Sequence, residues 1–153
     1  MAVKPIPEGY STVTPYMLVS GVARLLDFLK DAFGAEVLDT APGADGTIMH
    51  AEARIGDTRV MMGESTAQWP SRPGGFYLYV EDCDAVYRRA VEAGGRSLRE
   101  PTTEFYGDRS CGVEDPSGNQ WWIATHVEDV TPEEMERRHR EYVAAKAAAE
   151  TTA

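Results

Sequence analysis

The sequence matches itself when it is shifted by 61 residues, so that Pro15 coincides with Phe76, and this internal repeat limits the folds open to the chain. The match is one of apolar pattern rather than of residue identity, and it runs in one register without a gap. The other matching pairs are Met17 with Leu78, Val19 with Val80, Val22 with Cys83, Leu25 with Val86, Leu29 with Ala90, Gly34 with Gly95, Val60 with Trp121 and Met62 with Ile123. We therefore expect two copies of one structural unit.

Each copy has the pattern of one strand, one helix and three further strands. Residues 11–19 alternate between apolar and polar side chains, which is typical of a strand with one buried face. Apolar residues then recur at helical spacing over 22–33, and Gly34 stands where a C-cap glycine is expected. The remaining strands are predicted at 36–40, 47–55, 58–63, 75–80, 96–100, 109–113 and 120–125, and the second helix at 84–93. The fold class is therefore α+β, built from two tandem β-α-β-β-β units.

The same pattern gives the domain organisation. We expect a single domain over residues 10–127, with units at 10–65 and 74–127. A proline-containing linker, 66–73, joins them. A separate C-terminal helix is predicted over 131–150, because Thr131, Pro132 and Glu134 form a capping-box pattern at its start.

Composition excludes several classes of function. The formal net charge of −10 disfavours nucleic acid, whose phosphates an acidic surface repels. The N-terminal residues carry no apolar run of the kind found in signal peptides, and no stretch approaches the length of a membrane helix. The two cysteines, Cys83 and Cys111, form neither a disulfide framework nor a CxxC pair. We expect a cytoplasmic protein without a nucleic-acid or membrane partner.

Strand alternation assigns one set of side chains to the helix side of each sheet and a second set to the opposite face. The second set mixes aromatic, apolar and charged residues, which is typical of a small-molecule cleft. The alternative is two sheets packed face to face around a buried salt-bridge network. The second set comprises Thr14, Tyr16, Ile48, His50, Glu52, Arg54, Met61 and Gly63 in the first unit and Gly75, Tyr77, Tyr79, Arg109, Cys111, Val113, Trp122 and Ala124 in the second.

Two segments of this repeat resemble a known superfamily. The helix 25–34 and the turn 113–119, which contains an EDPSGN motif, are similar to those of the vicinal oxygen chelate proteins. These include glyoxalase I, extradiol dioxygenases, fosfomycin-resistance enzymes and bleomycin-binding resistance proteins. Segments 49–52 and 105–109 resemble the PhnB-like branch. The resemblance covers about residues 10 to 127. It implies the glyoxalase/bleomycin-resistance fold, a curved mixed sheet around a cleft, and, by analogy, a homodimer.

The resemblance also places the family's metal ligands, and this chain departs from the pattern at each of them. Matching the motifs assigns the four ligand positions to Thr14, Met61, Gly75 and Trp122, where family enzymes need His, Glu or Gln. Threonine is a poor ligand, and methionine, glycine and tryptophan do not hold such a divalent ion. We therefore expect no metal and no other cofactor, and a role like that of the bleomycin-binding members, which sequester a drug or metabolite. The predicted ligand-binding residues are Tyr16, Met61, Tyr77, Tyr79, Arg109 and Trp122.

An enzyme is the alternative. His50 and Glu52 lie two apart on one predicted strand, so both point to the cleft, where they could act as general base and orienting carboxylate. Arg109 could hold an anionic group in a bidentate fork. An off-pattern metal site made by His50, Glu52 and His126 is a further option, as is a buried His-Glu-Arg network that only fixes the cleft wall. The reaction would be that of a lyase, isomerase or dioxygenase, and whether the units pair within or between chains stays open.

Overall fold

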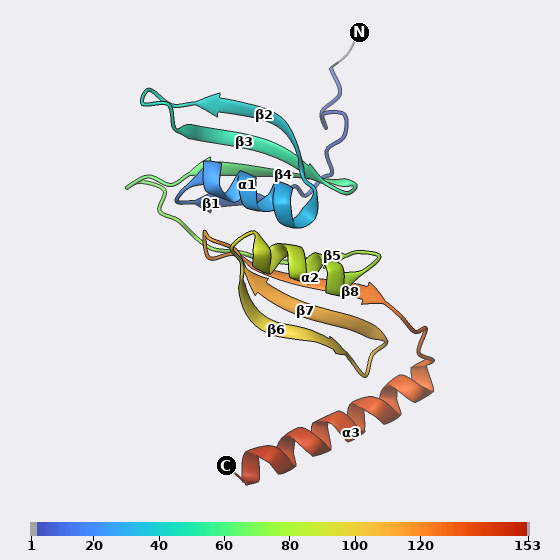
Figure 1. Ribbon diagram of the computed structural model, residues 1–153. Helices are drawn as coiled ribbons and strands as arrows, with labels where there is room; N and C mark the ends of the chain where they lie inside the picture. Colours follow the sequence, from blue (N-terminus) through green and yellow to red (C-terminus); the bar gives the residue numbers. More distant parts are fainter. Residues whose placement is uncertain (1–2, 153) are drawn as a thin grey trace.

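The computed structural model describes residues 3–152 and contains the two predicted β-α-β-β-β units followed by a C-terminal helix (Figure 1). The first unit consists of β1 (Tyr16–Val19), α1 (Val22–Phe33), β2 (Glu36–Pro42), β3 (Ile48–Ile55) and β4 (Thr58–Glu64). The second consists of β5 (Gly75–Tyr79), α2 (Cys83–Glu92), β6 (Arg96–Thr103), β7 (Asp108–Glu114) and β8 (Gln120–His126). Helix α3 (Pro132–Thr151) ends the chain. The predicted α+β class is therefore confirmed.

Each unit forms its own four-stranded mixed sheet. The strand orders are β1-β4-β3-β2 and β5-β8-β7-β6. In each sheet the first strand pairs in parallel with the last strand of its unit, and the other pairs are antiparallel. The parallel pairing requires a crossover connection, which the helix of each unit supplies. Figure 1 shows α1 and α2 next to each other where the two units meet, and each helix covers one face of the sheet of its own unit. Each sheet therefore has a helix side and an outer face.

Helix α1 begins and ends where local hydrogen bonds satisfy its free backbone groups. The Glu64 carboxylate accepts hydrogen bonds from the backbone N–H groups of Gly21 and Val22 at 2.8 and 2.9 Å. At the other end Gly34 has a φ of 66°, a left-handed conformation that glycine adopts without steric cost. In α2 the Asp82 side chain accepts from the N–H of Ala85. Because Glu64 belongs to β4, its cap also attaches the start of α1 to the first sheet.

The two units meet through their helix sides and share one apolar core. Helices α1 and α2 pack on each other. The ring of Phe33 at the end of α1 lies 5.0 Å from that of Trp121 on β8, centroid to centroid, and Phe76 on β5 stacks on the same indole at 4.6 Å. The Nε of Arg89 on α2 donates to the carbonyl of Ala32 on α1 at 3.3 Å. The outer faces take no part in this contact.

The turn before β8 is held by one buried carboxylate. Asp115, 4% exposed, accepts hydrogen bonds from the backbone N–H groups of Ser117 and Asn119, from the Asn119 side-chain amide and from the indole N–H of Trp121, at 2.8 to 3.0 Å. Asn119 in turn accepts from the N–H of Gly74 at 3.0 Å. The turn motif therefore connects the linker, β5 and β8.

Strand β7 does not follow the ungapped 61-residue register. Ala53 pairs with Val60 across the first hairpin, but Val113 pairs with Trp121 across the second, so the second hairpin is one residue longer. Because strand side chains alternate, a shift of one residue exchanges the two faces of the strand. The predicted outer-face positions of Arg109, Cys111 and Val113 were therefore wrong.

The N-terminal strand is shorter than predicted. β1 begins at Tyr16, and of residues 11–15 only Pro15 bonds to the sheet, through its carbonyl, which accepts from the N–H of Met61. Val13, expected on the buried face, is 83% exposed. The chain before β1 instead passes over the outer face of the first sheet, where the Tyr10 hydroxyl donates to the carboxylate of Glu52. Within residues 3–152, no helix combines the length and apolarity that crossing a membrane requires.

Replacing the buried carboxylate tests its role in the fold. We expect Asp115→Ala to lower the free energy of unfolding by about 3 kcal/mol or more, because several buried donors lose their acceptor. Urea denaturation followed by circular dichroism measures the change. Asp45→Ala, in the exposed β2–β3 turn, is the matched control and should cost less than about 1 kcal/mol. Equal effects of the two substitutions would contradict the assigned role.

Candidate functional site

The outer face of the first sheet gathers four of the predicted site residues. Tyr16 and Glu52 both pair with Met61, from β1 and β3 respectively, so the three side chains lie side by side on this face. The Tyr16 and His50 rings are 6.0 Å apart, and the Nε2 atom of His50 lies 3.6 Å from a carboxylate oxygen of Glu52. At 3.6 Å this is a contact between groups rather than a formed hydrogen bond. His50 and Glu52 are thus neighbours on this face, but no hydrogen bond joins them.

A hollow of about 370 Å³ lies over this face and is covered by the N-terminal segment. The Tyr10 ring is held between the Glu52 carboxylate and the guanidinium of Arg59, which lies 4.7 Å from the ring centroid. Glu52 and Met61 of the sheet form its floor, together with Thr14 at the end of the segment. All residues that line the hollow come from the first half of the chain: Pro5, Ile6, Pro7, Tyr10, Ser11, Thr12, Thr14, Glu52 and Met61.

The outer face of the second sheet is aromatic. Tyr77 and Tyr79 on β5 are 48% and 66% exposed, and their rings lie 5.3 Å apart. The Trp122 ring lies across Gly112, where any Cβ atom would collide with the indole. The guanidinium of Arg99 stands 5.6 Å from the Trp122 ring and donates to Ser110 at 2.5 Å. This face therefore presents exposed rings with a cation at one side.

A buried aspartate that the sequence analysis did not single out organises the end of this face. Asp108, 4% exposed, accepts a hydrogen bond from the Tyr79 hydroxyl at 2.8 Å through one oxygen. Its other oxygen lies 2.8 Å from Nδ1 of His126, whose Nε2 lies 2.8 Å from Asp129. The hydrogen bond to Asp108 stabilises the neutral phenol of Tyr79 and so raises the pKa of the Tyr79 hydroxyl. Sequence analysis could have found Asp108, because this residue precedes Arg109. A register shifted by one residue places it on the face to which Arg109 was assigned.

Three residues expected on this face, Arg109, Cys111 and Val113, lie on the helix side. Arg109 forms a two-point ion pair with Asp84 of α2, with N···O distances of 2.7 and 2.8 Å. The hydrogen bonds from Arg109 hold the pKa of the Asp84 carboxyl below its usual range. Cys111 is fully buried against the same helix, and burial raises the pKa of its thiol to about 12. Arg109 thus attaches α2 to β7 and does not belong to the outer face.

The off-pattern metal site was wrong for a single chain. Across residues 3–152, no group of three or more His, Cys, Asp or Glu side chains is close enough to hold an ion. His50 and Glu52 are on β3 of the first unit, whereas His126 ends β8 of the second and binds Asp108 and Asp129.

The four positions that the resemblance assigns to the family's metal ligands fall into two pairs, one in each unit. Thr14 lies with Met61 in the first unit, and Gly75 lies on β5 beside the β8 strand that carries Trp122. Their donor set is one hydroxyl, one thioether, no side chain and an indole. That set does not fit a divalent ion that prefers nitrogen, oxygen or thiolate ligands.

Comparison with known proteins identifies the family. The family model described as the Glyoxalase/Bleomycin resistance protein/Dioxygenase superfamily matches residues 12–123. The chain belongs to this superfamily. It is also 32% identical over 135 residues to the uncharacterized protein Rv0887c of Mycobacterium tuberculosis, a match that covers 81% of this chain and 79% of that protein. An uncharacterized protein of Mycobacterium bovis, Mb0911c, matches at the same identity and covers 81% and 89%.

Solved structures of the superfamily share the fold. TioX from Micromonospora sp. ML1 superposes with a TM-score of 0.62 at 24% identity, covering 79% of this chain and 100% of TioX. A PhnB protein from Bacillus cereus gives 0.62 at 17% identity, over 75% and 99%. A glyoxalase-related enzyme from Fulvimarina pelagi gives 0.64 at 16% identity, over 80% and 93%. The resemblance stated from the sequence is confirmed, with a PhnB protein among the structural neighbours.

The charge state of His126 can be tested directly. Hydrogen bonds to Asp129 and then to Asp108 raise the pKa of the His126 imidazole above its ordinary value near 6.5. The charged imidazole of His126 therefore stabilises the folded protein fully below about pH 6.5. This contribution to stability is lost as the pH rises through the higher pKa of His126 in the folded protein. An NMR titration of the histidine ring protons should show this raised pKa, and Asp129→Asn should lower it.

Glu100→Gln, on β6, is the control for that titration and should leave the pKa of His126 unchanged. A wild-type pKa at or below the ordinary value would contradict the assigned contacts.

Proposed function

We propose that this member of the superfamily binds a small, partly aromatic molecule without a metal ion and sequesters it. The observation that carries the proposal is the pair of outer faces. One has a hollow floored by Thr14, Glu52 and Met61, and the other has Tyr77 and Tyr79 exposed beside Trp122. Exposed rings with few polar groups are typical of small-molecule sites.

The binding cleft in this proposal needs both faces, and we assign the second wall to a partner subunit. Every residue around the hollow comes from the first unit or from the segment before it, and the contact between the units uses the helix sides instead. A homodimer in which the first unit of one chain faces the second unit of the other would enclose two equivalent clefts. In this arrangement the domain at 10–127 is the binding module and the helix at 131–150 lies outside it. A cytoplasmic location fits the two buried free cysteines.

The absence of a metal in this proposal is tested by elemental analysis. Protein purified without a histidine tag should contain no stoichiometric divalent metal, and Ni, Zn, Mn or Fe(II) should leave its Tm unchanged. The physical reason is the poor donor set at Thr14, Met61, Gly75 and Trp122. Near-stoichiometric metal with a raised Tm would overturn the metal-free proposal.

The shared cleft is tested by complementation between two inactive variants. A hit from a library of aromatic compounds should lose about tenfold or more in affinity with Met61→Arg or with Trp122→Ala, because each removes one wall of the cleft. Dimers refolded from a mixture of the two variants should regain one intact cleft, with wild-type affinity at half the sites of each heterodimer. Thermal unfolding confirms that each variant folds. Failure of the mixture to regain binding would place both walls within one chain.

A second candidate function is acid–base catalysis by the first unit. It is favoured by the proximity of His50 to Glu52, with the Tyr10 hydroxyl bound to the same carboxylate. In this alternative the protein is a lyase, isomerase or dioxygenase that acts on a small metabolite. Turnover that His50→Ala and Glu52→Ala abolish while ligand binding persists would support it, and binding without turnover would favour sequestration.

A further inference from the structure

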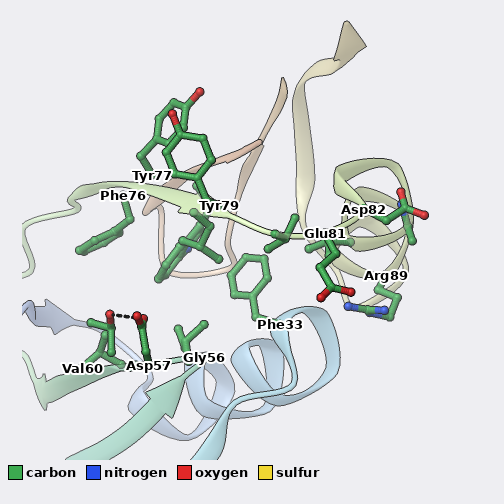
Figure 2. Close-up of a pocket in the computed structure, with 17 residues that line it drawn as sticks. Phe33, Gly56, Asp57, Val60, Phe76, Tyr77, Tyr79, Glu81, Asp82 and Arg89 are labelled. Atoms are coloured by element: carbon green, nitrogen blue, oxygen red, sulfur yellow. Dashed lines mark hydrogen bonds between the residues drawn. The ribbon is translucent and has the colours of Figure 1, made fainter. Parts of the chain in front are cut away.

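A second cavity lies between the two units and is lined mainly by helix-side residues, with Tyr77 and Tyr79 of β5 at its edge. Its volume is about 820 Å³, which is within the range of small-molecule sites. Figure 2 shows Phe33 projecting into its centre and Phe76 at one wall, while the Tyr77 and Tyr79 rings point away from Phe33. The cavity therefore differs in its walls from the cleft proposed above.

The walls of this cavity are apolar. Phe33 comes from the end of α1, Phe76 and Leu78 from the helix side of β5, and Ile55 from the end of β3. These four side chains are only partly buried, although they border the main core. Within the described part of the chain, no buried side-chain nitrogen or oxygen lacks a hydrogen-bond partner. The cavity wall therefore contains no buried polar side-chain atom that a water molecule would have to satisfy. Such a wall suits an apolar, ring-shaped occupant.

One side of the cavity is the free edge of β5. The N–H of Val80 donates to the carbonyl of Ala124, and the carbonyl of Gly74 accepts from Gln120, so even-numbered residues of β5 direct their backbone groups to β8. Because these directions alternate along a strand, the backbone N–H and C=O groups of Tyr77 and Tyr79 are directed to the open edge. These groups can hydrogen-bond to an occupant of the cavity.

The rim carries an excess of negative charge. Asp57 lies in the β3–β4 turn, and Glu81 and Asp82 lie between β5 and α2. Among the described residues that line the cavity, Arg89 alone is basic, and its Nε donates to the Ala32 carbonyl. Three carboxylates against one guanidinium, on a chain of net charge −10, favour a cationic ligand over an anionic one.

We propose that the cavity between the units is a second ligand site, for a flat aromatic molecule that carries one amine or other cationic group. The rings of Phe33 and Phe76 contact the aromatic part, the β5 edge supplies hydrogen bonds, and Asp57 and Glu81 attract the cation. The site is independent of the outer-face cleft, because its apolar walls come from the helix sides of the sheets.

A matched pair of three-ring dyes tests the proposal. The cation 9-aminoacridine should bind the full-length protein, and the anion 9-anthracenecarboxylate should bind at least about tenfold more weakly, measured by fluorescence anisotropy. Asp57→Asn and Glu81→Gln should each weaken binding of the cation about two- to fivefold, and added salt should reduce this effect. Asp82 is left unchanged because it caps α2.

Two controls locate the dye. Glu92→Gln removes an exposed carboxylate of α2 that does not line the cavity, and Trp122→Ala alters the outer face. Both should leave the affinity for 9-aminoacridine unchanged. Loss of affinity with Trp122→Ala, equal binding of the anion, insensitivity to Asp57→Asn and Glu81→Gln, or no binding of the cation would each overturn the proposal. None of these results depends on whether the outer-face cleft binds its own ligand.

Discussion

The indole of Trp121 is the contact on which the rest of the structure depends. One side of the ring stacks on Phe76 within its own sheet, and Phe33 of the other unit packs against it. Its N–H donates to Asp115, so the side chain is buried without an unpaired polar group. A single residue thereby joins the two units, the turn before β8 and the apolar core. The helix sides of both sheets are committed to this core.

Burial of the helix sides in this core determines which side chains remain accessible to a ligand. Because strand side chains alternate, burial of Trp121 turns its neighbour Trp122 to the outer face, beside Tyr77. In the first sheet Val60 and Met62 face the core, and Met61 between them faces the hollow. The side chains of the outer faces are consequently not needed for the contact between the units, and these faces can carry exposed rings and carboxylates. The gap between the units, beside Phe33, leaves helix-side residues open to a ligand.

The sequence predicted the fold well because its signals are local or repeated. Apolar periodicity located both units, and Gly34 and Thr131 marked helix ends that the structure confirms. The face of β7 was predicted wrongly, since an ungapped repeat hides one added residue in a hairpin. Arg109 was consequently assigned to the outer face, and Asp108 was overlooked. The inter-unit cavity could not be predicted, because it depends on how the units pack rather than on any pattern within one of them.

The longer second hairpin has a consequence for how the two halves diverged. If the units arose by duplication, one inserted codon in the turn before β8 lengthened this hairpin, while the pairing of β7 with β8 kept the two faces of the strand as they are in β3. By this pairing Ser110 and Gly112 are the counterparts of His50 and Glu52, and Cys111 and Val113 belong to the buried face. The turn absorbs the change in length. The two outer faces therefore diverged by substitution at equivalent positions, with a histidine and a glutamate in one unit and a serine and a glycine in the other.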